Sequence, residues 1–351
     1  MTGMPGTPRR GRPPARGRHR LRAATMHDVA RQVGVSHQTV SRVLNGSDSV
    51  SADTRARVLQ AIEDLGYRPN TAARALVTRR SQVLGVVSLD TTLYGPTSTL
   101  FGIEQAAREA GYFVSVASVK AITASTVRAA VDRLTEQNVD GVVVIVPLRT
   151  GEPLSGLPHG LPVVAVDGRT TAGLASVRVD QEEGGRLVTR HLLDQGAGTV
   201  LHLAGPADWF DAQDRLTGWR GELQRAGAPV HRPLRGSWSA SSGYEAGRRL
   251  ARRSDLDAVF VANDQMALGL LRAFHEIGIR VPQDVLVAGF DDVPEAAYYT
   301  PPLTTVRQDF GAVGRRSIEL LLDQVASGLD RGPQAVVPAQ LVVRQSTQRA
   351  G

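Results

Sequence analysis

The spacing of apolar residues changes along the chain and divides it into three parts. Between residues 25 and 66 the apolar positions recur every three or four residues, a spacing that predicts short helices. From residue 83 onward, short valine-rich runs alternate with segments of helical spacing, which is typical of an α/β protein. The first 22 residues follow neither spacing. We therefore expect a small helical domain followed by a larger α/β core.

The helical part predicts two short helices joined by a sharp turn. Gly34 falls where two steeply crossing helices require a positive φ angle, which glycine adopts without a Cβ clash. The hydroxyl of Ser36 is suited to cap the second helix. One stripe of that helix is apolar, and another carries hydrogen-bonding side chains: His37, Gln38, Ser41, Arg42 and Asn45. This arrangement favours a helix that lies in the DNA major groove, the alternative being an ordinary helical hairpin with a solvated face.

A third helix is expected after Ser51, which can cap it, and before Gly66, which can end it. Its apolar stripe is predicted to cover the first two helices and consists of Val58, Leu59, Ile62 and Leu65. These helices together predict a three-helix domain of the size that folds alone.

A short helix is predicted next, with Asn70 as its cap and Leu76 as its one large apolar side chain among alanines and arginines. A helix this short is mostly unfolded in water, so we expect it to form when something binds it. A lone leucine flanked by arginines resembles a wedge for the DNA minor groove. The alternative is a flexible linker in which Leu76 is incidental.

The α/β part contains two successive sets of strands and helices. Strands are expected at VLGVVSL, FVSVAS, GVVVIV and PVVAVD, and then at TVLHLAG, HRPLRG, DAVFVAN and DVLVAGF. Helices are expected near residues 97–110, 125–137, 182–194, 212–226, 242–252 and 265–277. Such an order predicts two parallel sheets, each covered by helices on both faces.

Polar residues directly follow three of these strands: Asp167, Asn263 with Asp264, and Asp291 with Asp292. Ligands of open parallel sheets bind outside the carboxyl ends of the strands, so the three sets together predict a cleft between two lobes. Each residue could instead cap the next helix, and for Asp264 and Asp292 we favour capping.

Composition narrows the classes of function. The chain has 351 residues, no cysteine and no apolar run as long as a membrane span, so disulfides, cysteine-ligated zinc and a membrane segment are not expected. The first 22 residues carry seven arginines without an acidic residue, which matches the formal net charge of +7. We interpret them as a disordered cytoplasmic extension that attracts DNA phosphates or has no role. Phosphate-cradling loops, metal-ligand spacings and nucleophile elbows are missing from the sequence, so no catalytic residue, metal or cofactor is predicted.

Several motifs resemble the lactose repressor (LacI/GalR) family of bacterial transcription regulators. They are TMHDVARQVGVSHQTVSRVLNG, VSADTRARV and LGYRPNTAARAL in the amino-terminal part, and LAGP, RLTGW, VANDQMALG, GFDD and PPLTTVRQDFGAVG in the core. The resemblance covers almost the whole chain from Thr25 to Thr347. It implies a helix-turn-helix domain (23–68) after a tail (1–22), a hinge helix (69–81), and a periplasmic-binding-protein-like core (82–347). Within this core the first lobe comprises about 82–180 and 308–340, and the second about 181–307 and the C-terminal strands.

The resemblance also implies which residues bind. Its sugar-contacting positions match Asp167, Arg215, Trp238, Asn263, Asp291, Gln308 and Phe310. Its DNA-contacting positions match Thr25, Ser36, His37, Gln38, Thr39, Ser41, Arg42, Asn45, Asn70, Ala73 and Leu76. We expect His37 and Gln38 to read bases, with His37 departing from the family pattern, while Thr39 and Ser41 hold phosphate. The wall of the first lobe also departs from that pattern, so the second ring or aglycone of the sugar is expected to differ: Leu89, Thr99, Ile145, Val179 and Val313.

These observations predict a cytoplasmic, nucleoid-associated repressor of a carbohydrate-utilisation operon that binds double-stranded operator DNA and is not an enzyme. A galactoside-like glycoside between the lobes is expected to release it from a pseudo-palindromic operator. Because no leucine heptad follows RQSTQRAG, we expect a homodimer. One alternative is a regulator of the same fold that uses a small-molecule corepressor. The other is a sugar-binding transport protein, which the helix-turn-helix motif opposes.

Overall fold

A computed structural model describes residues 24–44, 46–47, 49–67, 80–149, 154, 156–158, 160–167, 173–328 and 332–349. The chain divides into two compact units, Met1–Arg79 and Arg80–Gly351. The arginine-rich tail and most of the predicted hinge lie outside the described residues. So do four of the residues expected to contact DNA: Asn45, Asn70, Ala73 and Leu76.

The first unit contains three helices, α1 (Met26–Val33), α2 (His37–Leu44) and α3 (Ala52–Asp64). Thr25 precedes the first residue of α1, and its backbone N–H and hydroxyl both donate to the carboxylate of Asp28, at 2.9 and 2.6 Å. Gly34 ends α1 with a φ of 72°, which confirms the predicted glycine turn. The Ser36 hydroxyl accepts a hydrogen bond from the N–H of Thr39 at 3.1 Å, as expected for a cap of α2.

The apolar stripe of α3 differs in part from the prediction. Val58 is fully buried and Ile62 half-buried, but Leu59 is 51% exposed and Leu65 36% exposed. Ala61 and Tyr67 fill the core instead, together with apolar residues of the first two helices: Val29, Ala30, Val33, Val40 and Val43. Positions 58, 61 and 62 share one face of a helix, and position 65 already lies in the turn after α3. The prediction was wrong for Leu59 and Leu65 because an apolar side chain was equated with a core position.

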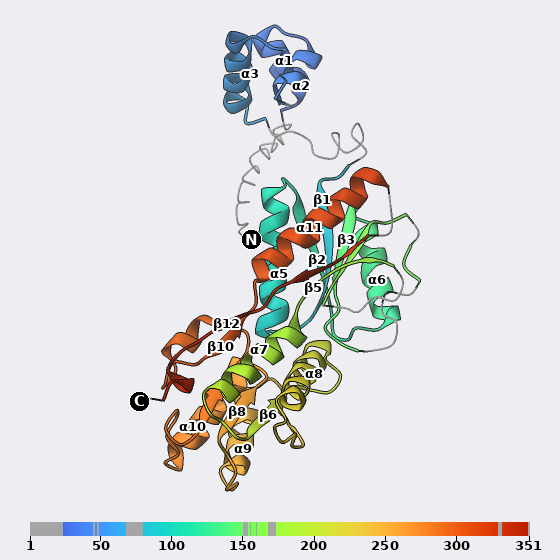
Figure 1. Cartoon of the computed structure of the whole chain (residues 1–351). Coiled ribbons are helices and arrows are strands. Elements are labelled where there is room, and N and C mark those ends of the chain that lie inside the picture. The colour runs from blue at the N-terminus through green and yellow to red at the C-terminus, as the bar shows by residue number, and fades with distance from the viewer. Residues whose placement is uncertain are drawn as a thin grey trace, which may run out of the picture. The chain divides into compact units, whose positions relative to one another are not determined.

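The second unit has two lobes, and the first is built on a six-stranded parallel sheet in the order β11-β5-β4-β3-β1-β2. Its strands are β1 (Val83–Leu89), β2 (Phe113–Val119), β3 (Gly141–Ile145), β4 (Val163–Val166), β5 (Ala175–Val179) and β11 (Gln334–Val337). Its helices are α5 (Tyr94–Glu109), α6 (Ala124–Thr135) and α11 (Phe310–Ser327). Figure 1 shows α5 and α11 on one face of this sheet and α6 on the other.

Alternate side chains of β1 enter the two layers of this lobe. Leu84 and Val86 pack with Ile103 of α5 and Leu321 of α11, whereas Val87 packs into the cluster beneath α6. This two-residue period is what the valine-rich strands predict for a sheet covered on both faces.

The second lobe has a four-stranded parallel sheet in the order β7-β6-β8-β9. Its strands are β6 (Val200–Ala204), β7 (Leu234–Arg235), β8 (Ala258–Val261) and β9 (Leu286–Ala288). Its helices are α7 (Gln181–Asp194), α8 (Phe210–Arg225), α9 (Ala240–Leu250) and α10 (Asp264–Glu276), with α7 and α8 contributing to one apolar layer and α9 and α10 to the other. The predicted pair of helix-covered parallel sheets is confirmed.

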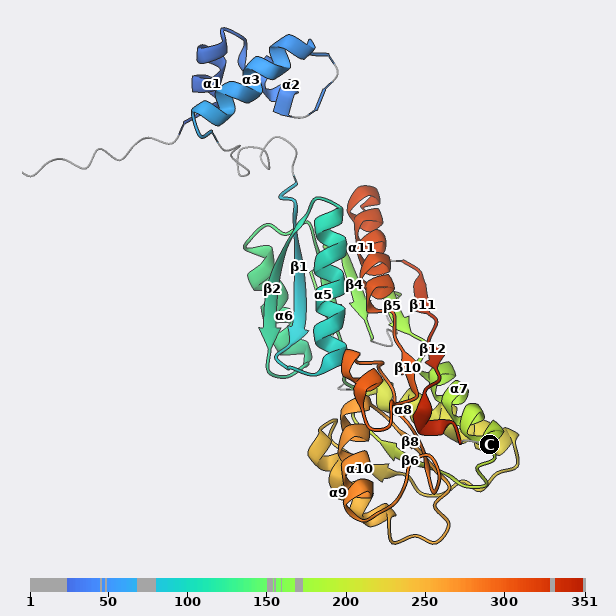
Figure 2. The same cartoon turned by 90° about the vertical axis from the view of Figure 1, so that its left-hand side faces the viewer.

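The chain passes between the lobes at three places: after β5, between β10 (Thr305–Arg307) and α11, and between β11 and β12 (Gln340–Val342). Figure 2 shows β10 and β12 together at this crossing, where they pair antiparallel. Short 3-10 helices span Pro294–Tyr298 and Gln345–Thr347. Within the described ranges, every helix is too short or too polar to cross a lipid bilayer.

Two details of the strand prediction need correction. The expected strands did not include β5, because its polar Ser176 and half-buried Arg178 interrupt the apolar pattern of the segment. In the structure β5 pairs with β4 on one side and with β11 on the other. The expected strand HRPLRG shrinks to the two residues of β7, since Pro233 lacks the N–H that a longer ladder needs.

Candidate functional site

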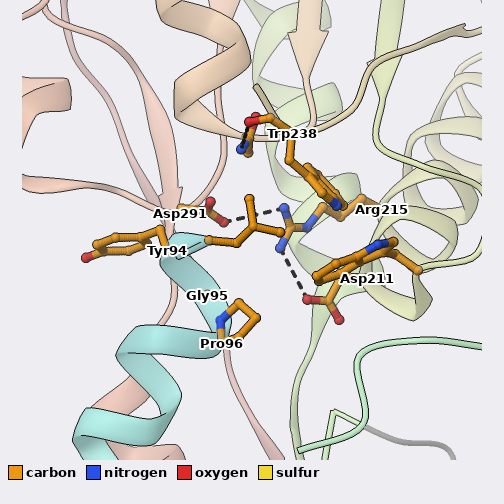
Figure 3. A pocket seen from close by; sticks show the side chains of 10 residues that line it. Tyr94, Gly95, Pro96, Asp211, Arg215, Trp238 and Asp291 are labelled. Atoms are coloured by element: carbon orange, nitrogen blue, oxygen red, sulfur yellow. Dashed lines mark hydrogen bonds and ion pairs between the residues drawn. The ribbon is translucent and has the colours of Figure 1, made fainter. Parts of the chain in front are cut away.

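A pocket lies between the two lobes, at the carboxyl ends of the strands of the second sheet (Figure 3). It contains about 330 Å³ of space unoccupied by protein atoms, part of which is open to solvent. The first lobe contributes the start of α5, and the second contributes polar and aromatic side chains. The lining residues are Leu93, Tyr94, Gly95, Pro96, Trp209, Asp211, Arg215, Trp238, Asn263 and Asp291.

The guanidinium group of Arg215, from α8, is the centre of this pocket. Its side chain is only 3% exposed. Its Nη1 lies 3.4 Å from Oδ1 of Asp291 and also donates to the carbonyl of Ala262, while its Nη2 lies 3.7 Å from Oδ2 of Asp211. The guanidinium carbon lies 3.8 Å from the centre of the Phe290 ring. These contacts hold a buried cation in one orientation, as a buried charge requires.

Two glutamines complete a ring of hydrogen bonds behind the ion pair. Arg215 Nε donates to Gln181 Oε1 at 2.9 Å, and Gln181 Nε2 donates to Gln308 Oε1 at 2.7 Å. Gln308 Nε2 donates to Asp291 Oδ1, also at 2.7 Å. Gln181 begins α7 and Gln308 precedes α11, so the ring links two segments at the crossing between the lobes to α8 and to the turn after β9.

Three carboxyl groups share the charge of Arg215. Burial raises the pKa of Asp291 from its ordinary value of 3.8 to about 7, against the opposing effect of Arg215. Burial also raises the pKa of Asp167 well above its ordinary value, and the charge of Asp211 raises it further. The pKa of Asp211 is raised by burial as well. The site therefore holds more acidic groups than one guanidinium neutralises, and hydroxyl donors of a ligand would stabilise their ionised forms.

Trp238 forms an aromatic wall of the pocket and has an unusual backbone. Its φ is 68°, a conformation that side chains rarely adopt. Its ring lies against Gly205, where an added Cβ would come within 2.2 Å of the indole. The indole is 7% exposed, and its Nε1 has no hydrogen-bond partner among the described residues. Trp209 meets it edge to face, with 5.6 Å between ring centres and 75° between planes.

The turn after β9 aims Asp291 into the pocket. Asp291 and Asp292 have φ angles of 112° and 53°, and such strained pairs persist when the surroundings hold them. The Asp292 carboxylate pairs with Arg307 at 2.6 Å and Arg344 at 2.7 Å, which fixes the turn to β10 and to the C-terminal segment. Asp292 is therefore structural but does not cap a helix, so the capping prediction is wrong for this residue.

Asp264 also differs from its predicted role. The cap of α10 is Asn263, whose Oδ1 accepts from the N–H of Met266 at 3.0 Å. Asp264 is fully buried inside the lobe and accepts from Thr305 Oγ1 at 2.7 Å and from the N–H of Val293 at 3.0 Å. It joins α10 to the neighbouring turn and does not cap its own helix.

Four of the seven residues expected to contact sugar line the pocket: Arg215, Trp238, Asn263 and Asp291. Gln308 lies behind them and orients Asp291. Asp167 follows β4 with a φ of 62° and interacts electrostatically with Asp211 and Arg215. Phe310 begins α11 and meets Tyr94 edge to face at 5.8 Å.

The first-lobe wall expected from the sequence is not the wall of this pocket. Thr99, Ile145, Val179 and Val313 are each at most 1% exposed and are packed inside the lobe, and Leu89 packs into the cluster beneath α6. The start of α5, from Leu93 to Pro96, takes that place. None of the five expected positions is among the residues that line this pocket.

Sequence reasoning also missed three residues of the second lobe. Asp211 stands four residues before Arg215, the helical spacing of an ion pair, and Trp209 is an aromatic residue just beyond the carboxyl end of β6. Both signals were available in the sequence. Gln181 gave no signal, because only the three-dimensional crossing places it between Arg215 and Gln308.

The first unit carries the second candidate surface. On α2, His37, Gln38 and Arg42 are exposed, whereas Thr39 and Ser41 are half-buried. The rings of His27 and His37 stack with 4.9 Å between their centres. Val40 and Val43 anchor the opposite side of α2 in the core of the unit. A rigid helix thus presents hydrogen-bonding groups outward, which is the geometry that base reading requires.

Comparison with known proteins finds matches for both parts of the chain. Residues 25–70 match the bacterial regulatory proteins of the lacI family, and residues 189–347 match a periplasmic binding protein-like domain. The lactose operon repressor of Escherichia coli (strain K12) is 35% identical over 330 residues, covering 93% of this chain and 91% of that protein.

Two solved structures are similar over most of the chain. The lac repressor dimer bound to operator and the anti-inducer ONPF has a TM-score of 0.81 at 34% identity, and covers 93% of this chain and 100% of that chain. The complex of transcriptional regulator CelR with cellobiose has a TM-score of 0.68 at 32% identity, and covers 92% of this chain and 99% of that chain. The protein therefore belongs to the lacI family of bacterial regulatory proteins.

Proposed function

We propose that this protein is a transcriptional repressor of a carbohydrate-utilisation operon, and that a glycoside bound between its lobes releases it from operator DNA. It acts in the cytoplasm on the nucleoid, as a homodimer whose two amino-terminal units bind the half-sites of a pseudo-palindrome. It requires no cofactor and catalyses no reaction. The similar proteins named above are transcription regulators, which supports this class of function.

The observation that carries this proposal is the chemistry of the inter-lobe pocket. Arg215, Asp291 and Asn263 offer fixed donors and acceptors beside the flat apolar face of Trp238. Sugars present the matching groups, since each pyranose has vicinal hydroxyls and an apolar C–H face. A hydroxyl of the wrong configuration would leave a buried partner unmet, at a cost of about 1–3 kcal/mol, so this arrangement distinguishes epimers. We propose a galactoside-like ring in this position.

The proposed DNA contacts divide into three groups. His37 and Gln38 read base edges, Arg42 extends the same face of α2, and Asn45, which lies outside the described residues, also contacts DNA. Thr25, Ser36, Thr39 and Ser41 hold phosphates, where contacts position the protein and carry no sequence information. In the segment outside the described residues, Asn70 and Ala73 belong to the hinge helix, and Leu76 is the wedge at a flexible pyrimidine–purine step of the central minor groove.

The proposed release mechanism uses the crossing between the lobes. A sugar that contacts Arg215 on one side and the start of α5 on the other binds best at one spacing of the lobes. It thereby shifts the first lobe, from which the hinge segment extends. A coupling of about 1–3 kcal/mol corresponds to roughly 5- to 150-fold weaker operator binding.

The test begins with an operator selected from random duplexes with the purified full-length protein. Binding of the labelled operator is then measured by fluorescence anisotropy at physiological salt, with and without saturating methyl β-D-galactoside. We expect a palindromic sequence and weaker binding in the presence of sugar. Tighter binding would identify the ligand as a corepressor. No preference for any sequence over random duplex would contradict the proposal of a repressor.

A further inference from the structure

A short backbone pairing joins the two lobes at the edge of the pocket. Leu148, which follows β3 of the first lobe, forms an antiparallel β-bridge with Trp209, which precedes α8 of the second lobe. The N–H of Arg149 donates to the carbonyl of Asp208 at 2.7 Å, and the N–H of Phe210 donates to the carbonyl of Pro147 at 3.0 Å. The backbone on both sides of Trp209 is therefore held by the opposite lobe.

This pairing places the Trp209 side chain in the inter-lobe pocket. The indole lines the cavity together with Trp238, and the two rings meet at 75°. Two faces at such an angle cannot stack on the same sugar ring. Trp238 lies beside Arg215, with 5.7 Å between the guanidinium carbon and the centre of the indole ring. Trp238 is therefore placed to contact the same sugar ring as Arg215. Trp209 offers a second, half-buried apolar face.

The carboxylate of Asp211 lines the same pocket as Trp209. Asp211 stands two residues after Trp209 and keeps 20% of its side chain exposed, whereas Asp291 on the other side of Arg215 keeps only 7%. One oxygen of Asp211 lies 3.7 Å from Arg215 Nη2, which leaves the carboxylate capacity to accept further hydrogen bonds. An apolar plate beside a hydrogen-bond acceptor suits a ring that has both C–H groups and hydroxyls, and an aryl group would leave Asp211 unused.

We propose that Trp209 is a specificity-determining residue that binds the second ring of a disaccharide effector, with Asp211 accepting hydrogen bonds from hydroxyls of that ring. This inference rests on the proposed function, because it assumes that a glycoside occupies the pocket. It adds the length of the effector: two sugar rings, one at Trp238 and Arg215 and one at Trp209.

Calorimetric titration of the full-length protein tests the inference with matched pairs of ligands. Lactose is compared with methyl β-D-galactoside, and cellobiose with methyl β-D-glucoside, so that each pair differs in the second ring. We expect one disaccharide to bind at least about tenfold more tightly than its methyl glycoside, the ratio that about 1.4 kcal/mol produces. Trp209→Leu, which keeps an apolar side chain for packing, should remove this preference, and Trp209→Phe should retain most of it.

Two further variants make the result specific. Asp211→Asn should weaken binding of the disaccharide by a larger factor than it weakens binding of 2-nitrophenyl β-D-galactoside, because both ligands meet Arg215 but only the disaccharide has hydroxyls on its second ring. Phe113→Ala is the control, because Phe113 is an aromatic residue of β2 that is 72% exposed. It should change none of these affinities.

The inference is overturned if the Leu variant keeps the disaccharide preference, or if methyl glycosides bind the unmodified protein as tightly as disaccharides. It is also overturned if only the nitrophenyl glycoside gains affinity from Trp209, since an aryl aglycone would then occupy this face. Each of these results leaves the proposed function intact. If no glycoside binds at all, the proposed function itself fails.

Discussion

Arg215 Nη1 lies 3.4 Å from Asp291 Oδ1, and the two side chains are only 3% and 7% exposed. This ion pair joins α8 to the turn after β9, and both partners face a cavity between the lobes. Removing two charges from water costs several kcal/mol per ion unless hydrogen bonds compensate. The ring through Gln181 and Gln308 supplies those bonds, so the donors and acceptors of the pocket are already oriented before a ligand arrives.

The ring of hydrogen bonds predicts that replacing Gln181 lowers the stability of the protein. Gln181→Ala removes the acceptor of Arg215 Nε and the donor to Gln308, both in a buried setting. Leaving such groups unmet should lower the free energy of unfolding by about 1–3 kcal/mol, measured by urea denaturation. Gln195→Ala is the matched control, because Gln195 is exposed beyond the other end of α7. Equal stability of the two variants would show that the ring contributes nothing.

The raised pKa of Asp291 predicts a pH-dependent stability. Its carboxyl group titrates near 3.8 when unfolded and at about 7 when folded, so the protonated form favours folding. This contribution is complete below 3.8 and is lost as the pH rises through 7. The unmodified protein should lose this contribution between pH 5.5 and pH 8, and Asp291→Asn should not. The melting temperature of Asp291→Asn minus that of the unmodified protein should therefore rise by at least about 2 °C from pH 5.5 to pH 8.

Asp284→Asn provides the control for that measurement. Hydrogen bonds from Arg280 lower the pKa of Asp284 to about 2, so this group is ionised at both pH values. Its effect on the melting temperature should be the same at pH 5.5 and at pH 8. If the Asp291 variant behaves in the same way, Asp291 is ionised throughout and our electrostatic description of the pocket is incorrect.

The positive φ of Gly34, in the turn of the helix-turn-helix unit, predicts that Gly34→Ala destabilises this unit. Gly34 has a φ of 72°, and apart from Gly34 and its two chain neighbours no atom of the described residues lies within 4 Å of the position that a Cβ would take, so Gly34→Ala introduces backbone strain without a clash. The expected cost is about 1–2 kcal/mol. Amide hydrogen exchange of α1 and α2 should accelerate roughly fivefold or more. Gly221→Ala in α8 has equal space and no positive φ, and it should be neutral or slightly stabilising. Unchanged exchange in the Gly34 variant would contradict the assigned role of this glycine.

The exposed side chains of His37 and Gln38 on α2 predict that their removal reduces the preference for operator over random DNA. His37→Ala and Gln38→Ala should each weaken binding to a selected operator by about 1–3 kcal/mol while hardly changing binding to random duplex. Gln32→Ala removes an exposed glutamine from α1 and is the control for Gln38→Ala. Competition anisotropy measures both affinities. A parallel fall in specific and random binding would show that these side chains contact phosphate and do not read bases.

The spacing of apolar residues and the identity of the turn and cap residues were sufficient to predict most of the architecture. Gly34, Ser36 and Ser51 occupy the predicted turn and caps, and the valine-rich runs form the two parallel sheets. These features depend on local geometry that a few neighbouring residues determine. Leu59 was misplaced because an apolar side chain does not by itself indicate burial.

The pocket could be predicted only in part. Arg215 and Asp291 lie in the motifs RLTGW and GFDD, and Trp238 matches a sugar-contacting position of the family. Gln181 enters the site through the crossing of separate segments, which no local pattern encodes. The start of α5 replaced the expected first-lobe wall for the same reason. The sequence indicates which side chains can bind a sugar, and the packing of the lobes decides which of them meet.

The central claim is that sugar binding and operator binding oppose each other within one chain. Linkage requires the effect to be reciprocal, so the most direct measurement is the affinity of one glycoside for the free protein and for the protein saturated with its selected operator. We predict that the sugar binds the operator complex roughly 5- to 150-fold more weakly than the free protein. Equal affinities would contradict coupling between the two sites, and tighter binding to the complex would reverse its sign.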